Sequence, residues 1–179
     1  MKLSEVEPHA LGMTVCAFLQ QEAADTLSEV LGVAGRSSLT AIVAACDGQH
    51  DVPPLAVIVR DLAIYAQCGK CPPMWTYPAA DGPKAVRHVR KATRLLFCPP
   101  PHYASVPLEL VLRATETRAR LGNVGSEIGS AELSIISGLT QRAVQQDAAR
   151  NRRKLPMSGF EAEEWLRAHG VKFAQDGAR

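Results

Sequence analysis

The chain has 179 residues, of which 46% are hydrophobic, so it is long enough for one compact domain or two small ones. Five cysteines without a recognisable signal peptide argue against a disulfide-built secreted domain, and no run of about 18 apolar residues predicts a membrane span. The net charge of +2 is unevenly placed: residues 1–83 carry 4 Lys and Arg against 9 Asp and Glu, whereas residues 84–179 carry 16 against 9. This asymmetry indicates a polyanion partner for the second half of the chain. Two surfaces of different net charge also arise by chance.

The first part of the chain has the spacing of apolar residues that is typical of helices. Residues 15–31 predict an amphipathic helix that ends at Gly32, and residues 39–46 predict a short, nearly all-apolar helix. Residues 55–67 fit a strand or a helix, and the entry at Pro53 and Pro54 together with the length favours a helix. We expect these helices to form a region for dimerisation or effector sensing, or simply an N-terminal core.

Residues 68–82 are rich in Gly and Pro and predict a loop that contains a Cys-x-x-Cys pair. Cys68 and Cys71 could chelate a zinc ion, with Cys98 and His102 completing a tetrahedral site. The long gap between the two pairs is unlike that of common zinc ribbons. A redox pair is a second alternative, but unmodified cysteines are the favoured interpretation. We therefore expect no metal and no cofactor.

Two further helices are predicted on either side of a run of three prolines at 99–101. The first, from Pro83 to about residue 97, is strongly basic and could either flank a DNA backbone or pack against the acidic N-terminal half. The second is capped by Ser105 and continues to Leu121, followed by a glycine-bearing loop over residues 122–129.

Two short helices separated by a glycine turn form the most informative pattern of the chain. Residues 132–137 predict a helix that ends at Gly138, Leu139 is expected to fill the angle, and Thr140 is expected to cap the next helix. In that helix, over residues 140–150, Val144 and Ala148 face inward. The residues expected to face outward are Gln141, Arg142, Gln145, Gln146 and Arg150.

This pattern resembles the helix-turn-helix segment of bacterial DNA-binding regulators, with Gly138 at the turn and Val144 at the buried position of the recognition helix. The resemblance implies that the early residues of the second helix contact base edges in the major groove. Gln pairs with adenine and Arg with guanine through bidentate hydrogen bonds. Ser134 departs from the family, which usually has alanine there.

The tail extends the resemblance to excisionase-type winged helix-turn-helix domains. A basic run of Arg152, Arg153 and Lys154 stands where a short wing is expected, and the resemblance implies that it contacts phosphates. A closing helix follows, in which Phe160, Trp165 and Leu166 are expected to pack back onto the helix pair. The wing segment shows no clear strand alternation, which leaves a simple loop as an alternative.

We therefore expect an all-α fold in three parts: an N-terminal helical region (1–82), a basic helix with a Pro-rich linker (83–104) and a helix-turn-helix domain (105–179). The predicted function is that of a sequence-specific, cytoplasmic and nucleoid-associated regulator that binds double-stranded DNA as a homodimer, with no contact to membranes. The sites that would carry the function are Thr140, Gln141, Arg142, Gln145, Gln146, Arg150, Arg152, Arg153 and Lys154. No catalytic motif is found, so we do not expect an enzyme. A protein–protein adaptor and an excisionase-like DNA-bending factor are the alternatives.

Overall fold

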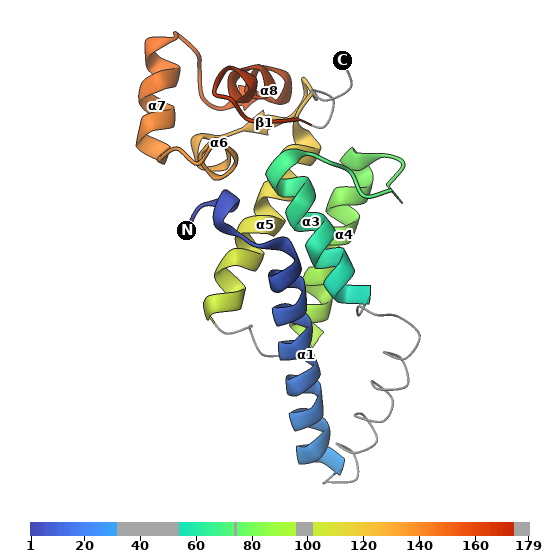
Figure 1. Cartoon of the computed structure of the whole chain (residues 1–179). Helices are drawn as coiled ribbons and strands as arrows, with labels where there is room; N and C mark the ends of the chain where they lie inside the picture. Colours follow the sequence, from blue (N-terminus) through green and yellow to red (C-terminus); the bar gives the residue numbers. More distant parts are fainter. Residues whose placement is uncertain (32–53, 74, 96–101, 174–179) are drawn as a thin grey trace.

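The structure, a computed structural model, describes residues 1–31, 54–73, 75–95 and 102–173. The described residues are mostly helical, with a single pair of two-residue strands, which confirms the predicted all-α class (Figure 1). None of the described helices is long and apolar enough to cross a membrane. The helix predicted over residues 39–46 lies outside the described residues.

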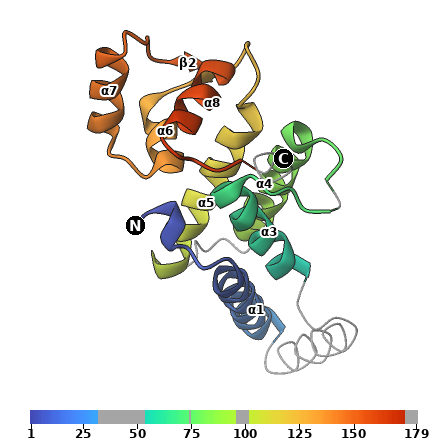
Figure 2. The same ribbon diagram turned by 45° about the horizontal axis from the view of Figure 1, so that its top comes forward.

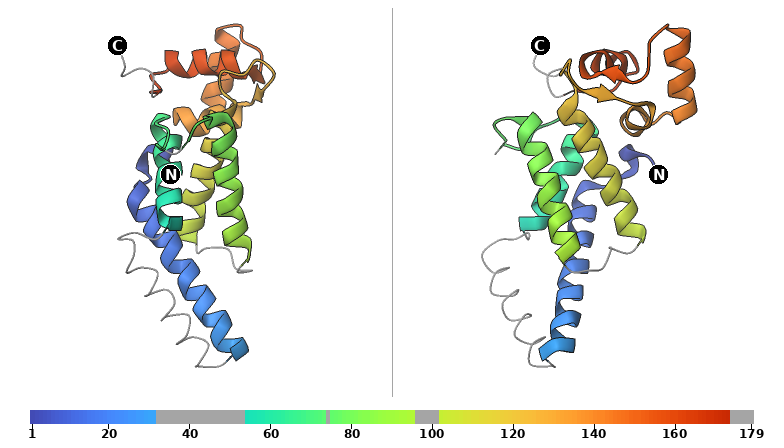
Figure 3. Two further views of the ribbon diagram at one scale, coloured as in Figure 1. Left: turned by 90° about the vertical axis from the view of Figure 1, so that its right-hand side faces the viewer. Right: turned by 180° about the vertical axis from the view of Figure 1, so that it is seen from behind.

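Four long helices form a bundle (Figures 1 and 3): α1 (Pro8–Leu31), α3 (Pro54–Cys68), α4 (Pro78–Leu95) and α5 (His102–Arg120). Helix α3 lies in the middle and packs against the other three. Its Val59, Leu62 and Ala66 are fully buried, which explains why its sequence is apolar on nearly every side. The helix expected over residues 55–67 is thereby confirmed. Val15 in α1 and Val86 in α4 are also fully buried in this core.

Three of these helices begin earlier than their sequence patterns predict. Helix α1 begins at Pro8, where the Glu7 carboxylate accepts hydrogen bonds from the amides of His9 and Ala10. Helix α4 begins at Pro78 and not at Pro83, because the Asp81 carboxylate accepts the amides of Thr76 and Tyr77, at 2.9 and 2.8 Å. Helix α5 begins at His102, so Ser105 lies inside the helix and does not cap it.

A short 3-10 helix, η1 (Leu3–Glu5), precedes α1, and the other elements make a smaller C-terminal unit over residues 121–173 (Figure 2). It contains α6 (Ser130–Ser137), α7 (Gln141–Arg150) and α8 (Gly159–Ala168). Strand β1 (Glu127–Ile128) pairs antiparallel with β2 (Met157–Ser158), with Ile128 opposite Met157. Both of these side chains are buried beneath the three helices.

The bundle and the C-terminal unit meet along α5 and share one hydrophobic core. Since α5 packs against both α3 and α4, it belongs to the bundle, and its last turn leads directly into the C-terminal unit. The boundaries predicted after residues 82 and 104 therefore do not coincide with divisions of the fold. The first falls inside α4, and residues 102–120, split by the second, form one unbroken helix.

A buried arginine fastens this junction. Arg118 of α5, only 5% exposed, donates to the carbonyl oxygens of Ala66 and Gln67 at the end of α3, at 2.6 and 2.9 Å. It also donates to the carbonyl of Lys172, at 3.4 Å, beyond the end of α8. A cation at the carboxyl end of α3 is favoured by the helix dipole, so Arg118 needs no carboxylate partner there. Burial lowers the pKa of this guanidinium.

Candidate nucleic-acid interface

The turn between α6 and α7 has the geometry that the sequence predicts. Gly138 has φ 71° and ψ 4°, a left-handed conformation that suits glycine, and its amide donates to the carbonyl of Ser134 at 3.0 Å. Thr140 is the N-cap of α7, and its hydroxyl accepts the amide of Ala143 at 3.2 Å. These two residues fix the direction in which α7 leaves the turn.

The inner faces of α6 and α7 are buried against each other. Leu133, Val144 and Ala148 are at most 1% exposed. Leu139, which was expected to fill the angle between the helices, is instead 38% exposed. The buried side chains on either side of the turn are those of Ile136 and Val144, and Leu139 is left at the surface.

The outer face of α7 consists of exposed amide and guanidinium groups from Gln141, Arg142, Gln145, Gln146 and Arg150, with Thr140 exposed at its start. Two of these side chains are held in place: the amides of Gln141 and Gln145 donate to the Ser130 hydroxyl of α6, at 3.0 and 3.4 Å. Arg142 and Gln146 make no side-chain hydrogen bond within the described part of the chain. Arg150 likewise has no such bond, so the face offers two oriented amides and three donor groups that are not engaged in the described part of the chain.

A polar contact that sequence reasoning missed sets the position of α7. The indole nitrogen of buried Trp165, in α8, donates to the Asp147 carboxylate of α7 at 2.7 Å. The same oxygen accepts the Asn151 amide at 3.1 Å and lies 3.4 Å from the His169 ring, which stacks on Trp165 with centroids 4.0 Å apart. The hydrogen bond from Trp165, with smaller contributions from Asn151 and His169, lowers the pKa of Asp147.

The basic run lies in the loop between α7 and β2. Because β2 pairs with β1 and not with a second strand of its own, this segment is a loop and not the hairpin of a wing. Arg152 and Lys154 are exposed, and Arg152 has a positive φ of 55°. Arg153 is half-buried and donates to the carbonyl of Glu161 at 3.2 Å, so it holds the loop against α8.

Helix α8 closes the unit, as expected, but with one difference. Trp165 and Leu166 are buried, whereas Phe160 is 53% exposed and does not pack onto the helix pair. Ser158 and Glu161 form a capping box at the start of α8, in which hydrogen bonds from Ser158 lower the pKa of Glu161. The helix thus begins one position before Phe160, which places that ring on its outer side.

The basic helix α4 lies on the opposite side of α5 from α7 (Figures 1 and 3). Its Arg90 pairs with Glu109 and Glu116 of α5, at 3.3 and 3.2 Å. These carboxylates lie outside the acidic segment 1–83, but α4 also packs against α3, which belongs to that segment. The second of the two predicted interpretations therefore holds for the packing of α4, although the ion pairs of Arg90 are to α5. The first is not favoured, since α4 does not share a face with α7.

The three zinc candidates that lie within the described residues, Cys68, Cys71 and His102, are not brought together. Cys68 ends α3 beside the carbonyls that Arg118 binds, and Cys71 lies in the irregular segment that follows the helix. His102 begins α5, sixteen residues before Arg118, and a helix of that length spans roughly 24 Å. Cys98 lies outside the described residues, among which no group of three or more potential ligands is found. Burial also raises the pKa of the Cys71 thiol, which disfavours a reactive thiolate.

The sequence matches no protein-family model, and searches of curated proteins and of solved structures also find no match.

Proposed function

We propose that this protein is a sequence-specific regulator that binds double-stranded DNA and places α7 in the major groove. The observation that carries the proposal is the division of α7 into two faces. Val144 and Ala148 are buried, and the opposite face exposes amide and guanidinium groups over its whole length. Such groups recognise adenine and guanine by paired hydrogen bonds, each worth about 1–3 kcal/mol of discrimination.

The neighbouring charges support the same orientation. Arg152 and Lys154 are exposed at the carboxyl end of α7, where phosphates flank a helix that lies in the groove. Ser130, at the start of α6, orients Gln141 and Gln145 before any ligand binds, which reduces the conformational entropy lost on binding. Arg142 and Gln146 supply the remaining donors. The proposal includes a homodimer, because one recognition helix contacts only a few base pairs.

The test is fluorescence anisotropy with labelled duplex DNA at two salt concentrations. Replacing Arg152 and Lys154 together by alanine is expected to weaken binding to random-sequence duplex and to lower the salt slope by about 2. The matched control replaces Arg87 and Lys91 of α4, which removes the same charge from an exposed surface on the other side of α5. Equal losses of DNA affinity in both double variants would mean that the protein binds DNA only through non-specific charge attraction.

Base recognition needs a second variant. Once a binding site has been selected from random duplexes, Arg142→Ala is expected to weaken that site by about 10- to 100-fold and random duplex far less. If Arg142→Ala weakened all sequences alike, α7 would contact only the backbone. Failure of the folded wild type to bind any duplex at low salt would remove the proposal.

An adaptor that binds another protein is the second candidate, because Phe160 and Leu139 are exposed, at 53% and 38%. An exposed aromatic ring such as that of Phe160 is enriched in protein interfaces. Phe160→Ser is expected to leave DNA affinity unchanged under the main proposal. A folded protein that ignores DNA but loses a partner contact on Phe160→Ser would favour the adaptor.

A further inference from the structure

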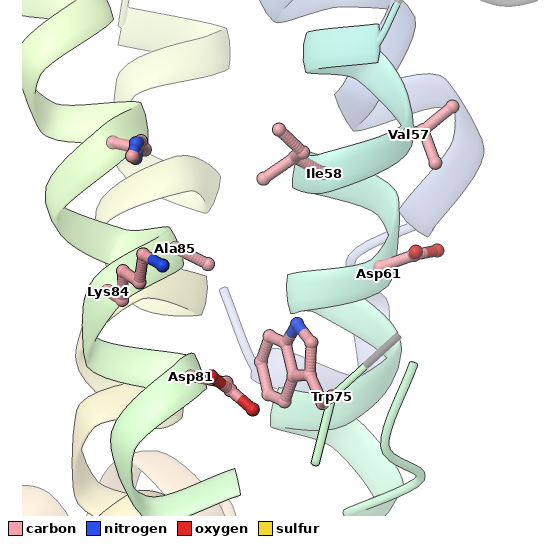
Figure 4. Close-up of a pocket in the computed structure, with 8 residues that line it drawn as sticks. Val57, Ile58, Asp61, Trp75, Asp81, Lys84 and Ala85 are labelled. Carbon is pink, nitrogen blue, oxygen red and sulfur yellow. The ribbon is translucent and has the colours of Figure 1, made fainter. Parts of the chain in front are cut away.

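A pocket of about 320 Å³ opens between α3 and α4 (Figure 4). Its size is at the lower end of the range for small-molecule sites. Ile58 of α3 and Ala85 of α4 face each other across it, and the ring of Trp75 stands between the two helices. All three side chains are only partly buried, so the pocket offers apolar surface that the fold itself does not cover.

Hydrogen-bond donors lie around this apolar surface. The Lys84 ammonium and the His88 ring line the pocket from α4, and the Trp75 indole nitrogen is directed into it. None of the three side chains makes a hydrogen bond or ion pair within the described part of the chain. The pocket therefore combines an apolar wall with donors that no protein group uses.

Two carboxylates also line the pocket, but both have partners. Asp61 forms an ion pair with Arg60 at 2.8 Å, and Asp81 accepts two backbone amides at the start of α4. Apart from Asp81, the charged residues of α4 are all basic, including the exposed Arg87 and Lys91. Arg87 and Lys91 lie outside the pocket lining, and Lys84 is the lining charge that has no partner in the described part of the chain. Its ammonium is therefore available to pair with an anion.

From this arrangement we propose that the pocket binds a small organic carboxylate with an apolar body. The carboxylate accepts from Lys84, with His88 and the Trp75 nitrogen as further donors, and the apolar body lies against Ile58 and Ala85. Charge-assisted hydrogen bonds to the ammonium orient the ligand, and burial of its apolar surface supplies the rest of the affinity. This binding does not depend on DNA recognition.

The experiment uses phenylacetate as the probe and the intact chain, followed by isothermal calorimetry and by tryptophan fluorescence. We expect saturable binding with a Kd on the order of 1 mM or tighter. Fluorescence should change on binding in the wild type and lose most of that change in Trp75→Phe, since Trp165 is buried in the other unit. Phenylacetamide, which has the same shape without the charge, is expected to bind about tenfold more weakly.

Two lysine variants of α4 distinguish a specific site for the carboxylate from non-specific attraction of the anion to a basic helix. Lys84→Gln is expected to weaken the binding of phenylacetate about tenfold. Lys91→Gln should change nothing, because Lys91 is also exposed on α4 but does not line the pocket. Ile58→Trp fills the pocket and should abolish binding, with its melting curve as the check of folding.

Several results would overturn the assignment. They are the lack of saturable binding by folded wild type, equal losses in Lys84→Gln and Lys91→Gln, and equal affinity for phenylacetamide. Tighter binding of zwitterionic phenylalanine than of phenylacetate would also overturn it. That result would show that Asp61 and Asp81, by attracting the ammonium of the ligand, determine what the pocket binds. Because no DNA is present, none of these results bears on the proposed function of α7.

Discussion

The helix bundle and the C-terminal unit are stabilised in different ways. The bundle consists of helices of 15 to 24 residues, whose fully buried aliphatic side chains meet over several turns. The helices of the C-terminal unit have only 8 to 10 residues, too few to be stable alone, and each is fixed by a defined polar contact or a close backbone approach. The exposed face of α7 is therefore positioned by a short buried face, with Val144 and Ala148, together with a few specific polar contacts.

The largest loss of stability is expected from a substitution at the first residue of α8. A Cβ atom on Gly159 would lie 2.2 Å from the carbonyl oxygen of Arg120 and 2.5 Å from that of Asn123, both of which are backbone atoms that cannot move aside. Gly159→Ala should lower the free energy of unfolding by about 3 kcal/mol, measured by urea denaturation. Gly125→Ala is the control, because its Cβ would meet only a side-chain oxygen at 3.5 Å. Similar stability of the two variants would contradict a close approach at Gly159.

The second largest loss of stability is expected when the hydrogen bond between α8 and α7 is removed. Trp165→Phe removes the hydrogen bond to Asp147 while it keeps most of the buried ring, so the expected loss is about 1.5–3 kcal/mol. Trp75→Phe is the matched substitution in the bundle, where the indole nitrogen has no protein acceptor in the described residues. We expect the loss there to be clearly smaller. If chemical denaturation gave equal losses, the polar contact would contribute nothing specific.

The same contact predicts a pH dependence. Because the folded-state pKa of Asp147 is lowered below its unfolded value of about 3.9, its carboxylate contributes stability that is complete above that unfolded pKa. This contribution is lost as the pH falls through the lowered pKa of the folded state. Melting temperatures measured from neutral to acidic pH should therefore fall less steeply below about pH 4 in Asp147→Asn than in the wild type. Parallel curves would rule out this role for Asp147.

The smallest loss of stability is expected from removing an ion pair on the surface of the bundle. Arg90 pairs with Glu109 and Glu116, but all three side chains are partly exposed to solvent. Arg90→Ala should cost less than about 1 kcal/mol, and the difference from wild type should shrink at high salt. Thermal unfolding in low and high salt measures both values. A loss as large as that of Trp165→Phe would mean that the bundle, too, depends on polar contacts.

The sequence predicts the parts of the fold that depend on local chemistry. Gly138 and Thr140 mark the turn because a left-handed residue and an N-cap have strong sequence preferences, and the spacing of Val144 and Ala148 shows which face of α7 is inward. The exposure of Leu139 and Phe160 was predicted wrongly, because a large apolar residue says nothing about which neighbour is present to cover it.

Contacts between distant residues could not be predicted in the same way. Asp147 and Trp165 are 18 positions apart, and a carboxylate in a short helix gives no sign of an indole partner. The start of α4 was misplaced because Pro78 and Pro83 are both acceptable first-turn residues, and only the capping by Asp81 decides between them. The pocket between α3 and α4 depends on helix packing, which the periodicity of either helix alone does not reveal.

The continuity of α5 has a mechanical consequence. Its 19 residues form a rod of roughly 28 Å whose base lies in the bundle and whose end carries the C-terminal unit. Within the described residues α5 runs without a break from the bundle to the C-terminal unit, so the orientation of α7 is coupled to that of the bundle. The consequence for the proposed binding to DNA is direct. Two copies joined through their bundles would hold their α7 helices at a fixed separation. Operators whose half-sites are moved apart by half a turn of the duplex, about 5 base pairs, should then be rejected and not accommodated.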